Sequence, residues 1–155
     1  MRELGPADGT LVVKTFREGV AAKAGHDLII EVTRWSAKVG EEAIELSADP
    51  RSLEVREGLR GAKPLSDRDR REIGKTIDEK VLGGRPIEFR STSIDEDVVA
   101  GELTMAGETR PVTVRRTPDG GRATLTQTEW GIKPYRGLMG ALKVRDDVEV
   151  VVSGL

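Results

Sequence analysis

The sequence predicts an all-β fold of about eight antiparallel strands with one helix in the middle of the chain. The first observation is that apolar and polar residues alternate with a period of two through most of the 155 residues, as in sheets with one buried face. The second is that glycine-containing turns separate several of these segments at hairpin distance. The third is that only one long segment changes to a helical period.

The predicted strands are short and rich in β-branched residues, which favour sheets. The alternation is clear near the end of the chain, where Val148, Val150 and Val152 share one face. The full set of predicted strands covers residues 10–16, 27–39, 42–48, 52–56, 86–94, 97–106, 110–117, 122–130 and 147–153. Turns at 106–109 and 118–121 join the strands between 86 and 130 into an antiparallel meander.

Residues 66–82 are predicted to form the helix. Ile73, Ile77 and Val81 recur at four-residue steps and form one apolar stripe. Ser66 is suited to the N-cap position, and a Gly-Gly pair followed by proline comes directly after the last turn. The segment therefore has both a start signal and a stop signal for a helix.

A short C-terminal helical turn is predicted at residues 134–142, because their apolar side chains recur at i, i+3, i+4 and i+7. The length of the chain suggests a single domain over residues 1–155. Its strands would form a closed barrel or a sandwich, and the residue pattern does not choose between the two. A barrel of about eight strands is just wide enough to hold a small ligand.

The composition narrows the classes of partner and chemistry. The chain has 25 Lys and Arg against 27 Asp and Glu, so nothing favours nucleic acid as a partner. It has no Cys, which excludes disulfides, thiolate nucleophiles and Cys-based metal sites. The N-terminus lacks the apolar stretch of a secretion signal, and no apolar run is long enough for membrane insertion. We therefore expect a soluble, cytoplasmic protein.

Four segments, in this order along the chain, resemble the YceI-like family. The most specific is residues 101–112 (GELTMAGETRPV), which is similar to the hairpin signature of the family. The others are residues 24–28 (AGHDL), which lead into a strand, residues 87–94 (IEFRSTSI), which follow the helix, and residues 130–132 (WGI), which precede the final strand. With the opening residues 9–12 and the final strand included, the resemblance spans about residues 9–154, nearly the whole chain.

The resemblance implies an extended, antiparallel, eight-stranded lipocalin-like barrel with a helical excursion. From several members of the family it also implies an isoprenoid or similar amphiphile held in the lumen. Trp130 departs from the family, which often has Phe at this position. Aromatic residues make up only 3% of the chain, which favours an aliphatic lumen over an aromatic-lined tunnel.

The first candidate ligand site is the lumen, lined by apolar residues of the alternating strands. An apolar cavity with few polar groups is a normal small-molecule site. The alternative is that the same side chains simply fill the core. The lumen set is Val13, Leu28, Ile30, Ile44, Leu46, Ile87, Phe89, Leu103, Met105, Val112, Val114, Val148, Val150 and Val152.

The second candidate is a mouth formed mainly by residues 131–145, which mix apolar side chains with cations. The cations would contact a phosphate or another polar head group. The alternative is an ordinary surface loop that caps one end of the barrel. The mouth set, which includes a histidine from the start of a strand, is His26, Trp130, Lys133, Tyr135, Arg136, Leu138, Met139, Leu142 and Lys143.

Catalytic, metal and phosphate chemistry find little support in the residue pattern. His26 is the only histidine, and a general base would also need a nucleophile and an orienting partner. Residues 66–82 hold five basic and five acidic residues, as expected of a solvated helix face. We expect no catalytic residues, no metal site and no cofactor.

Together these observations predict a binding or carrier protein rather than an enzyme. The partner would be an elongated apolar or amphiphilic small molecule, such as a polyisoprenoid, a quinone or a fatty-acid-like compound. Two alternatives stay open. One is a filled barrel without a lumen ligand that acts through its surface or as a homodimer, and the other, less favoured, is an enzyme that uses His26.

Overall fold

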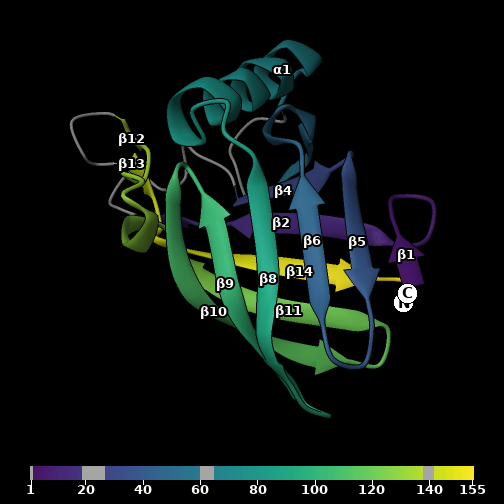
Figure 1. Ribbon diagram of the computed structural model, residues 1–155. Coiled ribbons are helices and arrows are strands. Elements are labelled where there is room, and N and C mark those ends of the chain that lie inside the picture. Colours follow the sequence, from purple (N-terminus) through teal and green to yellow (C-terminus); the bar gives the residue numbers. More distant parts are fainter. Residues whose placement is uncertain (1, 19–26, 60–64, 138–141) are drawn as a thin grey trace.

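The computed structural model describes residues 2–18, 27–59, 65–137 and 142–155, and it is dominated by one curled antiparallel sheet (Figure 1). The eleven strands of this sheet are β1 (Arg2–Leu4), β2 (Thr10–Thr15), β4 (Asp27–Val32), β5 (Trp35–Val39), β6 (Ile44–Ala48), β7 (Leu53–Leu59), β8 (Ile87–Ile94), β9 (Val98–Met105), β10 (Glu108–Thr117), β11 (Gly120–Thr126) and β14 (Asp147–Ser153). A second, three-stranded sheet consists of β3 (Arg17–Glu18), β12 (Arg136–Gly137) and β13 (Leu142–Val144).

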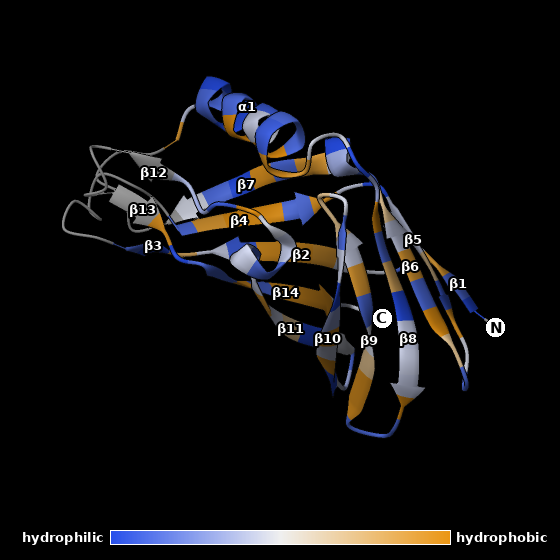
Figure 2. Cartoon of the chain, turned by 60° about the vertical axis from the view of Figure 1, so that its left-hand side comes forward, coloured by the Kyte–Doolittle hydropathy of each residue, from blue (hydrophilic) through white to orange (hydrophobic). Residues whose placement is uncertain are grey.

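The large sheet forms an open half-barrel rather than the closed eight-stranded barrel that we expected. Its strand order is β1-β5-β6-β8-β9-β10-β11-β14-β2-β4-β7, and within the described residues no pairing joins the edge strands β1 and β7. Edge strand β1 has only three residues, while α1 lies against β7 and covers that edge (Figure 2). A short edge and a covered edge are both protected without closure.

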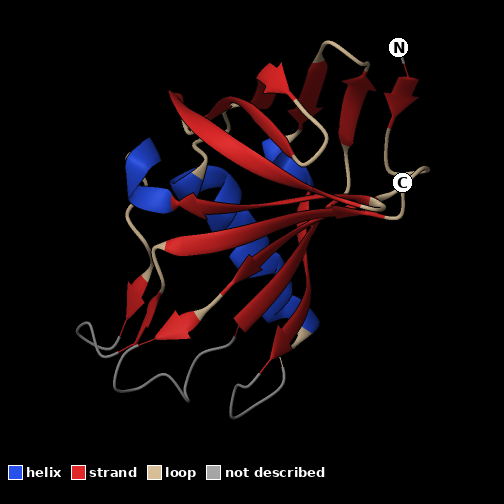
Figure 3. Ribbon diagram, turned by 90° about the horizontal axis from the view of Figure 1, so that it is seen from below, coloured by secondary structure: helices blue, strands red, loops and turns tan. Residues whose placement is uncertain are grey.

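The helix is confirmed, with its predicted N-cap. Helix α1 (Asp67–Thr76) continues as one π-helical stretch, η3 (Ile77–Val81). Ser66 and Asp69 form a capping box, in which the Ser66 hydroxyl accepts from the Asp69 backbone N–H at 3.1 Å and the Asp69 carboxylate accepts from the Ser66 N–H at 3.1 Å. The helix lies across one end of the half-barrel, behind the strands when the molecule is seen from below (Figure 3).

The hairpin between β9 and β10 is confirmed at the predicted position. Its two-residue loop is Ala106 and Gly107, with φ angles of 51° and 79°. Left-handed φ at both loop positions is the type I′ geometry, whose twist matches that of the flanking strands. The turn therefore sets the register that pairs Met105 with Glu108.

The predicted single strand over residues 27–39 is wrong, because the chain turns a corner at Thr33 and Arg34. Apolar residues occupy even-numbered positions up to Val32 and odd-numbered positions from Trp35 onward. A straight strand would therefore send Trp35 to the face opposite Val32. The corner moves the chain from one side of the half-barrel to the other, so that both side chains pack in one cluster.

Two other boundaries differ from the prediction. The helical turn expected at residues 134–142 is wrong, because β12 and β13 pair with each other and β13 pairs with β3. Glycines at 137 and 140 weaken a helix there, and pairing with a distant strand supplies backbone partners. Residues 138–141 lie outside the described ranges. The strand predicted over 122–130 ends at Thr126 and is followed by the 3-10 helix η4 (Gln127–Trp130).

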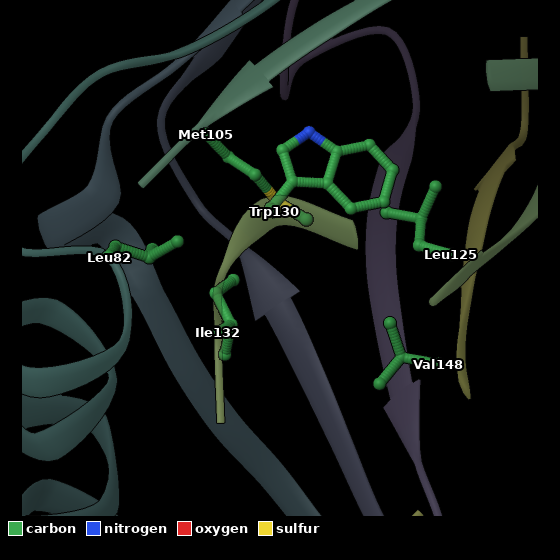
Figure 4. Close-up of a cluster of buried hydrophobic side chains, with 6 residues drawn as sticks. All are labelled: Leu82, Met105, Leu125, Trp130, Ile132 and Val148. Atoms are coloured by element: carbon green, nitrogen blue, oxygen red, sulfur yellow. The ribbon is translucent and has the colours of Figure 1, made fainter. Parts of the chain in front are cut away.

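Two buried clusters form the core, and a short row of side chains packs against both. The helix-end cluster is Leu82, Met105, Leu125, Trp130, Ile132 and Val148 (Figure 4). The corner cluster is Leu11, Val32, Trp35, Ala37 and Ala48. The half-buried residues that pack against both clusters are Val13, Leu53, Ile87 and Val150. The apolar interior is thus continuous from one cluster to the other.

The corner between β4 and β5 is held by Ser52, from the short helix η2 (Pro50–Ser52). Ser52 is only 2% exposed. Its hydroxyl lies within donating distance of two backbone carbonyl oxygens, that of Asp49 at 2.8 Å and that of Arg34 at 3.2 Å. Its own carbonyl oxygen accepts from the backbone N–H and the hydroxyl of Thr33, at 2.8 and 2.9 Å. Ser52 therefore ties the corner to the start of β7.

We expect Ser52→Ala to lower the free energy of unfolding by about 1–2 kcal/mol, because the carbonyl oxygens of Asp49 and Arg34 lose the buried hydroxyl that donates to them. Urea unfolding followed by circular dichroism measures the effect. The matched control is Ser47→Ala, since Ser47 is exposed on β6, and a change there should stay within about 0.5 kcal/mol. Equal values for the two variants would show that the corner does not depend on Ser52.

Candidate functional site

The candidate site is the inner, concave face of the half-barrel, which the strand register defines. Residues paired across antiparallel strands point to the same face, and residues two apart along one strand do so too. Val13 pairs with Ile30 on one side and with Val150 on the other, and Phe89 pairs with Leu103. Following these pairs from strand to strand assigns one face of all eleven strands.

All fourteen residues of the predicted lumen lie on this inner face. The same alternation appears in Figure 2 as apolar and polar bands along the strands. In the order of the chain, the fourteen are Val13, Leu28, Ile30, Ile44, Leu46, Ile87, Phe89, Leu103, Met105, Val112, Val114, Val148, Val150 and Val152. The charged residues of the described strands that share this face lie near strand ends: Arg2, Glu108, Arg110 and Arg116.

The inner face is only partly covered. Of the fourteen residues, Ile30, Met105 and Val148 are buried, and the remaining eleven are partly exposed. The Phe89 ring lies directly over Gly101, where an added Cβ would come within 2.6 Å of ring carbons. Apolar side chains in a filled core would be covered throughout, so the middle of the half-barrel presents apolar surface that its own chain does not bury.

A depression of about 700 Å³ is lined in part by residues of the β5–β6 and β8–β9 turns, which lie at the end of the half-barrel opposite α1 (Figure 1). Its lining combines inner-face residues of four strands with residues of the β5–β6 and β8–β9 turns: Arg2, Val39, Gly40, Glu41, Ile94, Asp95, Glu96 and Arg116. The Arg116 guanidinium donates to the Asp95 carbonyl oxygen at 3.0 Å. Two cations against three carboxylates leave no strong preference for a charged head group.

A second depression, of about 490 Å³, lies beside η3 and away from the inner face. Its lining is polar and consists of Arg51, Asp78, Glu79, Gly83 and Gly84. The helix end of the interior is packed by the helix-end cluster, in which Trp130 is only 1% exposed (Figure 4). Among the described residues, the inner face therefore leads to a depression at the end opposite the helix.

Of the residues predicted to form a mouth, the structure pairs Arg136 with Lys143 across β12 and β13 and places Trp130 in the core. Trp130 is a core residue, and its indole N–H donates to the Leu103 carbonyl oxygen at 2.9 Å. Lys133 is exposed, and Tyr135 is 61% exposed. Arg136 belongs to β12, and Leu142 and Lys143 belong to β13. His26, Leu138 and Met139 fall outside the described ranges.

Sequence reasoning missed several inner-face residues, most notably Trp35. It is 6% exposed, and among the described residues its indole N–H has no hydrogen-bond partner. The Thr15 hydroxyl, also on the inner face, is likewise buried and has no hydrogen-bond partner in the described part of the chain. The apolar residues shift from even-numbered to odd-numbered positions after Val32, and this shift was the signal that would have placed Trp35 on the inner face. The other residues missed on this face include Leu11, Val32, Val55, Val99 and Leu125.

Two further properties concern only the described part of the chain. No group of three or more His, Asp or Glu side chains there is arranged to hold a metal ion. None of the helices in the described ranges has the length and hydropathy that crossing a bilayer requires.

The fold and the inner face define the chain as an antiparallel β half-barrel with an apolar interior that opens at one end. The model of the YceI-like domain matches residues 30–154. The chain belongs to the YceI-like family, as the sequence motifs predicted. YceI-like domains bind polyisoprenoids and other lipids, which supports a binding role for this chain. No curated protein matches the sequence.

Proposed function

We propose that this protein is a carrier that holds an elongated apolar or amphiphilic molecule against the inner face of the half-barrel, without catalysis. The observation that carries the proposal is the incomplete burial of eleven of the fourteen predicted lumen residues, all of which lie on the inner face. Covering apolar surface contributes about 25 cal/mol per Å². A hydrocarbon chain laid along this face gains that free energy, and it needs few polar contacts to do so.

The type of ligand follows from the wall of the site. Most inner-face residues are Val, Ile and Leu, and the charged ones lie near strand ends. This arrangement suits a flexible isoprenoid, quinone tail or acyl chain laid along the inner face. The cytoplasmic location stays a prediction from the sequence.

The alternative of a filled interaction protein has its own support, since the corner cluster and the helix-end cluster are both packed. An interior without a ligand would leave the surface, including the exposed Tyr135, as the site of action, and a homodimer would be one form of it. The enzyme reading rests on His26, which lies outside the described ranges.

Native mass spectrometry of the purified protein, followed by solvent extraction, tests the carrier proposal. We expect a stoichiometric apolar adduct, or, for ligand-free protein, a rise in melting temperature when farnesol, ubiquinone or palmitate is added. At a ligand concentration of one hundred times Kd the stabilisation is about 2.7 kcal/mol, or roughly 5–10 °C for a chain of this size. A clean apo mass without a shift for any of the three would favour the filled protein.

A further inference from the structure

The feature behind this inference is Trp35, at the start of β5 on the inner face. The residue pairs with Ala48 of β6 and packs against Leu11 and Val32 from the opposite side of the half-barrel. Its position follows from the corner at residues 33–34, which turns β5 across the interior. Trp35 is therefore the largest side chain of the corner cluster.

The two tryptophans of the chain differ in how their indole N–H groups are satisfied. Trp130 donates to the Leu103 carbonyl oxygen at 2.9 Å. Trp35 Nε1 is equally inaccessible, yet no acceptor among the described residues lies within hydrogen-bond distance. A buried donor without an acceptor costs about 1–3 kcal/mol, and native proteins keep few of them. The described part of the chain therefore supplies no hydrogen-bond acceptor for the Trp35 N–H.

Inner-face residues connect Trp35 to the depression opposite α1. Along β5 the inner-face side chains are Trp35, Ala37 and Val39, and Val39 lines the depression. The distance along the strand from Val39 to Trp35 is about 13 Å, at about 3.3 Å per residue. Small side chains at Ala37 and Ala48 flank the indole. Ala37 and Ala48 are only 7% and 6% exposed, so an elongated molecule that enters from the depression and follows β5 would have to displace the cover of the corner cluster to reach the indole.

We propose that Trp35 selects ligands carrying a hydrogen-bond acceptor, by donating its indole N–H to a carbonyl oxygen on the bound apolar molecule. An indole N–H only donates, so a carbonyl complements it, whereas a plain hydrocarbon leaves it unsatisfied. This inference rests on the proposed carrier function and adds the ligand class, an apolar chain with a carbonyl group. Trp35 is a specificity-determining residue in this reading.

The test compares an isoprenoid ketone, farnesylacetone, with an isoprenoid hydrocarbon, farnesene, in wild type and in Trp35→Phe. The substitution keeps an aromatic ring and removes the N–H. We expect it to weaken farnesylacetone binding about tenfold, equivalent to 1.4 kcal/mol, and to change farnesene binding less than about twofold. A purely structural role of the ring would weaken both ligands by the same factor, so the ratio of the two dissociation constants is the readout.

A second measurement is made on the wild-type protein, so it does not depend on how well a variant folds or binds. The chain has two tryptophans, so a ¹H–¹⁵N spectrum of the wild type contains two indole signals. We expect farnesylacetone, but not farnesene, to move the Trp35 indole proton downfield. Wild-type protein that binds both compounds without this shift, or an unchanged ratio in Trp35→Phe, would overturn the role of Trp35 and leave the carrier function standing. Wild-type protein that binds neither compound would overturn the carrier function itself.

Discussion

Replacing Val13 with Trp should lower the affinity for an isoprenoid ligand at least tenfold, whereas the same change at Val12 should leave it unaltered. The two residues are neighbours on β2 and are both half-buried. Val13 lies on the inner face opposite Val150 and Ile30, while Val12 pairs with Val151 and Glu31 on the outer face. An indole at position 13 would occupy the space that the carrier proposal assigns to the ligand.

The stability of the same two variants separates an open interior from a filled one. Extra volume in a packed core costs about 1–3 kcal/mol. A filled interior therefore predicts that Val13→Trp, but not Val12→Trp, is destabilised by that amount in the absence of ligand. An open interior predicts lost binding with stability close to that of Val12→Trp. Titration with farnesylacetone and urea unfolding of both variants give the two readouts, and unchanged binding in Val13→Trp would contradict the carrier proposal.

Truncating Trp130 to Ala should lower the free energy of unfolding by about 3–5 kcal/mol, the range for large aromatic side chains in a core. Trp130 is the largest fully buried side chain of the described residues, and it packs with Met105, Leu125 and Ile132 (Figure 4). Its loss would remove the centre of the helix-end cluster, and it would also remove the hydrogen bond to the Leu103 carbonyl oxygen.

Trp130→Phe separates packing from hydrogen bonding at this position. The phenyl ring keeps much of the contact area but cannot donate, so we expect a loss of about 1–2 kcal/mol. Trp35→Phe is the matched control, because it removes an indole N–H without an acceptor among the described residues. It should therefore cost less than Trp130→Phe. Urea unfolding followed by circular dichroism avoids the tryptophan signal, and a loss below about 1.5 kcal/mol for Trp130→Ala would show that the cluster closes around the gap.

The membership of the inner face could be predicted from the sequence because side-chain direction in a strand is a local property. Val148 and Val150 alternate with Asp147 and Glu149, and any sheet that buries one of these valines buries the row. The strands β12 and β13, within residues 131–145, could not be predicted from the sequence in the same way. There the apolar spacing resembled a helix, but the backbone of β13 pairs with β3, which is more than one hundred residues earlier in the chain.

The sequence by itself determined most of the long strands of the sheet, the hairpin at Ala106 and Gly107, the capped helix, and the family. Each of these depends on neighbours within a few residues, through side-chain alternation, left-handed turn positions or an N-cap. Only the tertiary structure decided that the sheet stays open and that Trp35 faces Leu11 across the interior. Strand pairing and the acceptor of a buried N–H depend on residues that are far apart in the chain. Local sequence patterns do not specify which of these distant segments come into contact.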